Sequence, residues 1–564
     1  MNSPRLLLLL SFFAFVLVAD ITSAYQQGSR RASQDPRQCR IQRLTASRPS
    51  RKIQSEGGVT ELWDENEEQF QCAGVAAMRN VIQPNSLSLP NYSPSPRLVY
   101  VHKGQGLLGI SYPGCAETYD SGEQEEQQEE QGQEEQQRRR RGGEGRQHEE
   151  EQEEEEKQRR QRGRRGEEGR KQREEQQEQE EEEEQKESWG QQGRRRGSRG
   201  DQHQKIHRIR HGEVVALPAG AAHWCFNDGN EELVTVSITD VNSQWNQLDQ
   251  TPWSFYLAGG QPSGIRKPSE RESEREGQRE REQEGSERER ESEKQRRKRE
   301  SESEGSEEEE RSSFNAQNIL SSFDANMIAQ AFNVPNDIAR KLTREDNRGF
   351  IVKVQRGGMG MIKPDEEQQQ ERGRSTRENG LEETFCNMRL NQYLDNPREA
   401  DIYSRQAGRL NSVNMHKLPI LRYLDLSAEK TNLNPNSIVA PHWSMNAHTI
   451  LYITKGDGNL QVVGSNGRSV FNERVSEGQM VVVPQYFASA QRAGRNGVEW
   501  VAFKTSALPM KSPLAGHASV FKGLPLQVIT NSYRISNQQA QQLKQNREHQ
   551  HLLFPPSRTT SMSS

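Results

Sequence analysis

The chain has 564 residues, of which 30% are hydrophobic and 28% are charged, and its formal net charge is −5 at pH 7. The length would allow about three or four domains, but so low an apolar fraction cannot offset the ordering entropy of the whole chain. The composition therefore excludes a fully globular chain and predicts disordered parts, and the net charge gives no argument for a nucleic-acid partner.

The N-terminus has the pattern of a secretory signal peptide over residues 1–24. Arg5 precedes an apolar run at residues 6–19, and small residues follow up to Ala24, after which we expect cleavage. The run is short for a transmembrane helix, and no later segment qualifies as one. We therefore predict a soluble protein that enters the secretory pathway and has no membrane partner, with a membrane anchor as the alternative.

Five cysteines in an oxidising compartment predict two disulfides and one free thiol. Cys225 lies in the apolar run 221–226, which favours a buried free thiol. The sequence by itself leaves open how the other four pair: Cys39, Cys72, Cys115 and Cys386.

The first ordered segments have strand composition. Residues 57–63 predict a turn that leads into a short strand, and residues 70–82, which include Cys72, are expected to be a further strand. Residues 84–112 predict a strand pair. Strands are also expected at 212–227 and 232–238.

Three polar tracts contain no apolar periodicity. Residues 120–204 are almost wholly Glu, Gln, Arg and Gly, residues 267–311 repeat Ser, Glu and Arg, and residues 364–379 form a shorter tract. Disordered insertions are predicted. One alternative for the first tract is a long charged helix. Another is an Arg-rich nucleic-acid-binding tail, which the interleaved Glu and near absence of aromatic residues disfavour.

Helical spacing marks two other regions. Residues 314–342 predict a helix that Asp324 could cap at its start, followed by a short helix after Pro335. Near the C-terminus a second polar helix is expected at 538–544. Residues 350–354, 418–426, 478–484 and 499–503 read as strands.

Two stretches, at 84–106 and 435–458, nearly repeat each other. Each has Pro-Asn-Ser at its start and a β-branched, aromatic run that ends in Lys-Gly-x-Gly. A repeat at this separation indicates a duplicated domain and not a solenoid. Far more residues separate Gly104 from Gly212 than Gly456 from Gly478. The charged tract 120–204 is therefore predicted to be a loop that has grown within a shared fold.

Residues 212–227 carry the second sequence signature of the cupin superfamily at every fixed position, which are Gly212, Pro218, Gly220, His223 and Asn227. The positions of the first signature are held by Asn85, Asn91, Ser93, Arg97 and Gly104 in one copy, and by Asn436, His442, Ser444, Thr449 and Gly456 in the other. The chain thus resembles a bicupin. This resemblance implies a mainly β fold of two tandem cupin barrels (double-stranded β-helix, or jelly roll), each followed by a small helical segment.

Metal-bearing cupins hold a transition metal with three His and one Glu. Here the first copy retains only His223 and has Arg97 at a ligand position, while the second retains only His442, with Ser444, Thr449 and Ser489 in the other places. We therefore expect no metal, no cofactor and no catalytic residues. A metal-dependent bicupin enzyme and a small-ligand-binding cupin remain as alternatives, and His448 beside His442 leaves open a fortuitous surface metal site.

The segment Asn379-Gly-Leu-Glu-Glu-Thr-Phe-Cys386, together with the two cupin motifs and the charged insertion, resembles a legumin-type seed storage globulin. That resemblance implies cleavage by asparaginyl endopeptidase between Asn379 and Gly380, and disulfides Cys39–Cys72 and Cys115–Cys386. It also implies trimers in the endoplasmic reticulum and hexamers in the protein storage vacuole, with Ile328 and Phe332 buried between protomers.

Storage also fits the composition, because Arg, Gln and Asn are rich in nitrogen and disordered tracts are accessible to proteases. The sequon Asn91-Tyr92-Ser93 falls in an expected strand and is followed by Pro94, so little glycosylation is expected.

The predicted organisation is a signal peptide at 1–24, a first cupin domain at 25–266, a disordered tract at 267–311, a helical segment and linker strand at 312–363, a disordered tract at 364–379, a second cupin domain at 380–540 and a tail at 541–564.

Overall fold

The computed structural model describes residues 39, 41–115, 119–120, 202–260, 317–344, 346–355, 359, 386 and 388–556. The expected signal peptide, most of the three charged tracts and the expected cleavage site at Asn379 and Gly380 lie outside these residues.

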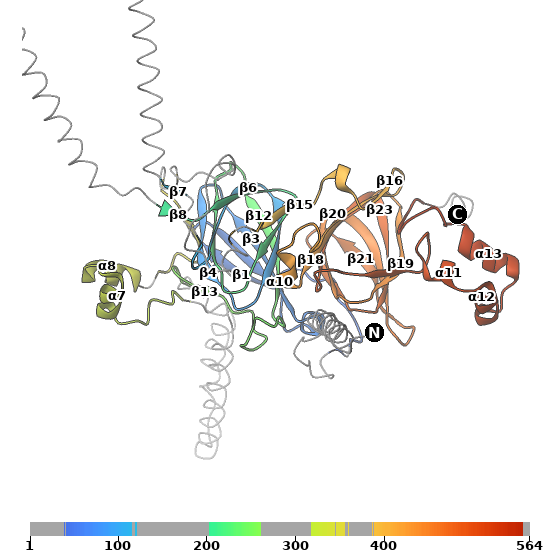
Figure 1. The fold of residues 1–564 in the computed structure, drawn as a ribbon, viewed down its shortest axis with the longest axis horizontal. Coiled ribbons are helices and arrows are strands. Elements are labelled where there is room, and N and C mark those ends of the chain that lie inside the picture. The colour runs from blue at the N-terminus through green and yellow to red at the C-terminus, as the bar shows by residue number, and fades with distance from the viewer. Residues whose placement is uncertain are drawn as a thin grey trace, which may run out of the picture. The chain divides into compact units, whose positions relative to one another are not determined.

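The first barrel consists of two antiparallel sheets (Figure 1). One sheet has the order β1 (Arg51–Ser55), β2 (Gly58–Leu62), β3 (Val75–Ile82), β12 (Leu233–Asp240), β5 (Arg97–Lys103), β10 (Glu213–Leu217), β15 (Asn391–Tyr393). The other has the order β13 (Phe255–Tyr256), β4 (Ser86–Tyr92), β11 (Ala222–Asn227), β6 (Gln105–Ser111), β9 (Ile206–Arg210), and β14 (Ile351–Lys353) also pairs with β4.

The second barrel is a ten-stranded antiparallel sheet that closes through its two long strands, β20 and β23. Its strands are β16 (Ile402–Ser404), β17 (Gly408–Val413), β18 (Ser427–Leu433), β19 (Ile438–Ser444), β20 (Thr449–Val463), β21 (Ser469–Ser476), β22 (Met480–Val483), β23 (Ala488–Lys504), β24 (Lys511–Pro513) and β25 (Leu553–Phe554).

The two barrels repeat one topology, as the duplicated motif predicts. Strand β20 pairs with β22 through its first half and with β21 through its second, just as β5 pairs with β10 and β6 with β9. Gly104 and Gly456 stand at the equivalent turn with φ of 79° and 72°, a region that favours glycine. The charged tract lies between β6 and β9, where the second barrel has only the short turn 464–468.

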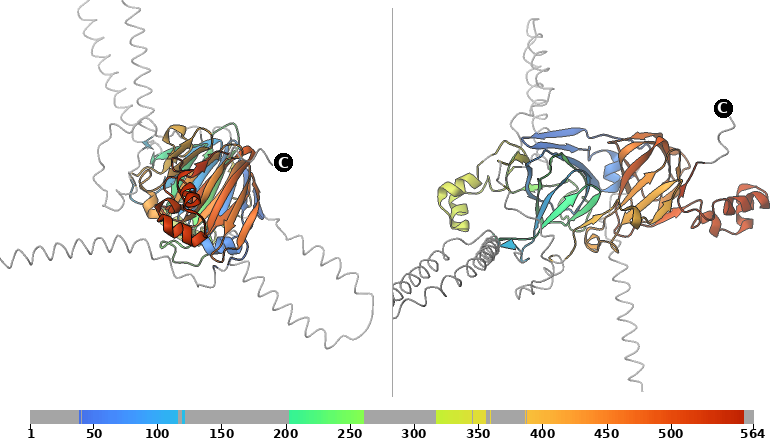
Figure 2. Two further views of the ribbon diagram at one scale, coloured as in Figure 1. Left: turned by 90° about the vertical axis from the view of Figure 1, so that its right-hand side faces the viewer. Right: turned by 90° about the horizontal axis from the view of Figure 1, so that it is seen from above.

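The helices follow the predicted spacing. Asp324 caps α7 (Ala325–Phe332) by accepting hydrogen bonds from the backbone N–H groups of Asn326 and Met327, which confirms the expected cap. Helix α8 (Asn336–Leu342) follows it. The C-terminal helices are α11 (Val520–Gly523), α12 (Leu526–Tyr533) and α13 (Asn537–Gln545), and they form a cluster outside the strands of the second barrel (Figure 2).

Two segments predicted as strands begin as helices. Residues 70–82 contain the end of α2 (Glu68–Ala73), so Cys72 lies on a helix that Gly74 terminates at φ 64°, and only β3 follows as a strand. Residues 418–426 contain α10 (Leu421–Leu424), which Asp425 ends in the left-handed region, and a single-turn 3₁₀ helix lies upstream at Pro397–Glu399. Both runs are buried and apolar, and over so few residues periodicity does not separate a buried helix from a buried strand.

Each half of the chain also supplies a piece of the other half's barrel. Near the N-terminus, the backbone of Leu44 donates to Val470 O at 2.9 Å, and Ser47 forms a β-bridge with Met480. In return, β15 from the second half extends the first barrel's sheet beside β10. One buried apolar cluster contains side chains from both barrels, including Trp63 and Tyr452, whose ring centroids are 6.0 Å apart.

The described residues of a second unit, Cys115–Lys205, form one strand pair. There β7 (Tyr119–Asp120) pairs with β8 (Gln202–His203), and the Gln204 side chain donates to the Cys115 carbonyl at 3.0 Å.

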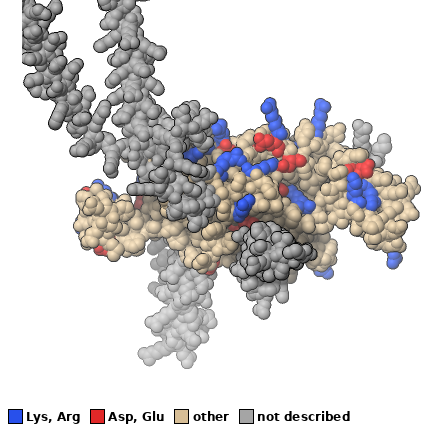
Figure 3. Space-filling view, viewed as in Figure 1, with Lys and Arg blue, Asp and Glu red and all other residues tan. Residues whose placement is uncertain are grey.

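None of the helices in the described ranges is both long and apolar enough to span a bilayer. On the face seen in Figure 3, basic and acidic side chains are scattered over the barrels, with no continuous basic stripe among the described residues.

Candidate functional site

The residues at the cupin ligand positions do come together inside each barrel. In the first barrel, Asn91 on β4 lies opposite His223 on β11, and Arg97 starts β5. In the second, His442 and Ser444 lie on β19 and Thr449 starts β20, where Ser444 Oγ and Thr449 Oγ1 are 3.2 Å apart. The sequence pattern therefore located both barrel interiors.

A single local geometry recurs at three of these positions. Asn91 donates its side-chain amide to Leu89 O at 3.0 Å, His442 Nδ1 donates to Ala440 O at 2.9 Å, and His223 Nδ1 donates to Ala221 O at 3.3 Å. Each side chain thus binds the carbonyl two residues before it. Since a carbonyl can only accept, both histidines carry their proton on Nδ1 and leave Nε2 as the free acceptor.

A guanidinium occupies the first barrel's interior. Arg97 is buried, and it donates to Thr239 Oγ1 at 3.1 Å and to Ser254 Oγ at 3.3 Å. Burial lowers its pKa, but a guanidinium keeps its proton in proteins. A fixed positive charge at a former ligand position repels a metal cation.

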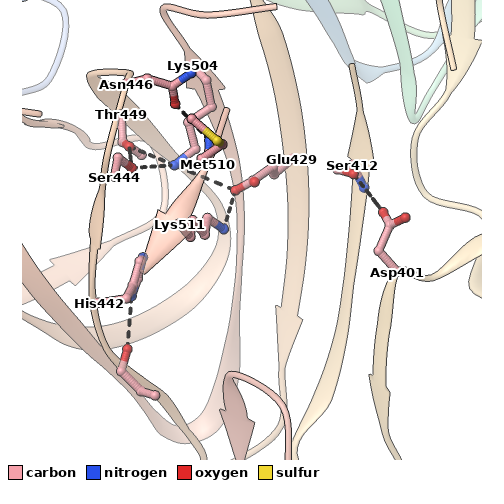
Figure 4. Close-up of polar contacts among 11 residues, drawn as sticks. Asp401, Ser412, Glu429, His442, Ser444, Asn446, Thr449, Lys504, Met510 and Lys511 are labelled. Carbon is pink, nitrogen blue, oxygen red and sulfur yellow. Dashed lines mark hydrogen bonds and ion pairs between the residues drawn. The ribbon is translucent and has the colours of Figure 1, made fainter. Parts of the chain in front are cut away.

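An ammonium group takes the corresponding place in the second barrel (Figure 4). Lys504, the last residue of β23, donates to Thr449 Oγ1 at 2.7 Å and lies 3.5 Å from Ser444 Oγ. Glu429 on β18 accepts from Lys511 Nζ at 2.6 Å and lies 3.7 Å from Lys504 Nζ. The Lys504 amine therefore stands where metal-bearing cupins place their ion, bonded to the two hydroxyls that replace metal ligands.

Burial and neighbouring charges shift the pKa values of the groups in this cluster. Burial alone would raise the pKa of Glu429, but Lys504 and Lys511 hold it down to about 2. Burial lowers the pKa of Lys504 to about 8, and Glu429 opposes this fall. Burial lowers the pKa of His442 to about 3, so this imidazole is neutral at physiological pH. The surrounding cavity is about 20 Å³, which leaves room for about one water molecule.

Sequence reasoning did not identify Glu429, Lys504 or Lys511. Lys504 follows the apolar run at 500–503, and strand alternation from buried Ala502 places it on the same face. A charged residue at an inward-facing strand position was the available signal.

No group of three or more metal-ligating side chains occurs among the residues that the structure describes. His448, considered as a surface ligand beside His442, instead accepts at Nδ1 from the backbone N–H of Gln485 at 3.3 Å. The imidazoles of His223 and His442 belong to different barrels, and a buried cation accompanies each.

These interiors predict a metal-free protein. Elemental analysis of the purified, chelator-washed protein should find far less than one Mn, Fe, Cu or Zn per chain, because Arg97 and Lys504 disfavour a divalent cation. A Glu473→Gln variant, changed at a surface ion pair, serves as the control and should give the same metal content. One tightly held metal per barrel would contradict the prediction.

The cysteines divide into bonded and free. A disulfide joins Cys39 to Cys72, and Cys115 and Cys386 are each disulfide-bonded. Cys225 is free, and burial raises the pKa of its thiol to about 12, which makes it a poor nucleophile.

Comparisons with a family model, with known sequences and with solved structures agree with one another. A cupin family model matches residues 44–262 and 392–541. An 11S globulin seed storage protein of Sesamum indicum is 46% identical over 523 residues, which is 92% of each chain. Among solved structures, procruciferin, an 11S globulin of Brassica napus, has a TM-score of 0.64 at 31% identity and covers 93% of this chain and 99% of its own. An 11S globulin of Wrightia tinctoria with an auxin binding site has a TM-score of 0.65 at 29% identity, covering 92% and 97%.

Proposed function

Since the chain belongs to the 11S seed storage globulins of the cupin family, we propose that it is deposited in the protein storage vacuole after cleavage into two disulfide-linked polypeptides. The chain is a seed storage protein, the function that the names of its relatives give, and it is not an enzyme. The observation that carries this function is the barrel interior, because buried side chains of the protein fill the place of a reactive centre.

The expected cleavage site fits the fold. In the sequence, the bond between Asn379 and Gly380 lies in the long segment between β14 and β15, so hydrolysis there leaves every described strand and helix of the two barrels uncut. An Asn-Gly pair also favours a turn, and a protease needs such an accessible backbone.

The disulfide linkage of the two products is supported by the cysteine count. Of five cysteines, two are bonded to each other, Cys225 is free, and Cys115 and Cys386 are each bonded. We propose that the last two bond to each other and join the acidic chain to the basic chain.

Electrophoresis of the tissue protein tests the cleavage. A single band without reductant should split into two with reductant, and the smaller product should begin at Gly380. An Asn379→Gln variant should remain one chain in both lanes, since the protease requires asparagine, while Asn391→Gln should be cut normally. A product that begins at another residue would refute the site.

A second prediction concerns the segments that each half of the chain supplies to the other half's barrel, which are residues 41–50 and β15. A cleaved Cys386→Ser variant should separate into two chains in detergent without reductant but should remain one particle in gel filtration at neutral pH. The reason is that residues 41–50 pair with the second barrel and β15 pairs with the first, so each product still completes the other. Two separate peaks in gel filtration would show that the disulfide alone joins the halves.

Assembly into trimers and then hexamers through the helical segments is part of the proposal. Large apolar side chains are exposed on α7 and α12, among them Met327 at 59%, Phe332 at 57% and Tyr533 at 57%. Exposed apolar surface of this kind suits contact with another protomer. Ile328 corrects one detail of the expectation, because it is buried within the chain against Ala339 and not left for a neighbour.

A second candidate role is small-ligand binding, which the auxin binding site of the Wrightia tinctoria globulin favours. Equilibrium dialysis with labelled auxin tests this role, and retention of about one molecule per chain would support it.

A further inference from the structure

The first barrel contains a buried cation that no carboxylate neutralises. Arg97 is only 7% exposed, and both of its hydrogen bonds go to neutral hydroxyls, those of Thr239 and Ser254. No ion pair forms between Arg97 and any residue within the described ranges. The second barrel differs, because Glu429 there offsets Lys504 and Lys511.

An unpaired buried charge costs several kcal/mol as an order of magnitude. Other groups around Arg97 do not relieve this cost. His223 is neutral, since burial and then Arg97 lower its pKa to about 4, and burial keeps Tyr256 in its neutral phenol form by raising its pKa. The site therefore has a positive charge and no counter-charge of its own.

Beside the guanidinium lies a cavity of about 60 Å³. This is roughly the liquid volume of two water molecules and three times the cavity of the second barrel. Asn91 also lines this cavity, and its buried Oδ1 accepts no hydrogen bond from the described residues. An unsatisfied buried acceptor next to an unpaired buried cation indicates that the cavity is occupied.

We propose that the interior of the first barrel binds one small monovalent anion, a halide or a short carboxylate, against the Arg97 guanidinium. The anion supplies the missing negative charge, and beside a halide the remaining space holds one water that donates to Asn91 Oδ1. The volume excludes phosphate esters and aromatic acids, so the site is distinct from a hormone pocket. It adds a bound ion to the storage protein and does not depend on cleavage or assembly.

Thermal unfolding of the full chain in chloride-free buffer tests the proposal. With sodium gluconate as the bulky anion at constant ionic strength, replacement by sodium bromide or by sodium acetate should raise the wild-type midpoint with the logarithm of the anion concentration, by about 5 °C at roughly 100 times the dissociation constant. An Arg97→Met variant should unfold at a higher temperature than wild type in gluconate and should show no such rise. An Arg474→Met control, at an exposed ion pair with Asp457, should respond as wild type does.

Each outcome of the unfolding experiment either supports or overturns the proposed anion site. A rise with bromide alone identifies a halide, and a rise with acetate alone identifies a carboxylate. No rise with either anion, or an equal rise in Arg97→Met, would overturn the site. If Arg97→Met does not fold, wild-type crystals grown in bromide and others grown in acetate give the answer: an anomalous peak or carboxylate density within hydrogen-bonding distance of the guanidinium supports the proposal, and a cavity holding only water in both crystals refutes it.

Discussion

A Glu429→Gln variant should lose about 3–5 kcal/mol of unfolding free energy at neutral pH, the typical result of removing one member of a buried ion pair. Glu429 lies 3.7 Å from Lys504 Nζ and 2.6 Å from Lys511 Nζ, and Lys504 is only 1% exposed. The neutral amide would leave the Lys504 ammonium buried without a counter-charge. Urea unfolding followed by circular dichroism measures the loss.

Two further variants separate the ion pair from a simple change of side chain. Glu473→Gln, at an ion pair whose side chains are 52% and 76% exposed, should change the free energy by less than about 1 kcal/mol. The triple variant Glu429→Leu/Lys504→Met/Lys511→Met should recover most of the stability, because apolar residues can replace a buried ion cluster at little cost. A loss below about 1 kcal/mol in Glu429→Gln would mean that the cluster is not charged in the folded state.

The unfolding free energy should also fall by about 4 kcal/mol between pH 7.5 and pH 5.5. Burial is the main cause that lowers the pKa of His102 and His223 to about 4 and that of His442 to about 3. An unfolded histidine titrates near 6.5. In this window the unfolded state therefore binds more protons than the folded state, and stability decreases as the pH falls. Each histidine contributes about 1.4 kcal/mol at pH 5.5.

The Glu429 carboxylate does not contribute to the change in unfolding free energy between pH 7.5 and pH 5.5. The pKa of Glu429 lies below its unfolded value, so its contribution is present above about pH 4.3 and is lost as the pH falls toward 2. Urea unfolding at both pH values measures the histidine effect.

The matched variants are His223→Asn and His442→Asn. Asparagine preserves the bond to the carbonyl two residues earlier, as Asn91 does in the first barrel. Each substitution should reduce the pH-dependent loss by about 1.4 kcal/mol. An unchanged pH dependence in the double variant would show that these imidazoles do not titrate as described.

The sequence by itself determined the duplicated cupin fold and the absence of a metal-binding ligand set. Period-two strands, turn glycines such as Gly104 and Gly456, and the cap at Asp324 are local signals, and the structure has them where they were expected. The ligand positions could also be assessed residue by residue, because a cupin metal needs imidazole and carboxylate at fixed spacing.

Only the tertiary structure decided what fills the barrels and how the halves combine. Helices α2 and α10 replace expected strands, since packing overrides a short apolar pattern. Lys504 lies 55 residues from Thr449 in sequence yet donates to its hydroxyl, and residues 41–50 pair with a barrel more than 400 residues away. Contacts between such distant residues depend on the closed fold, and no local pattern of residues encodes them.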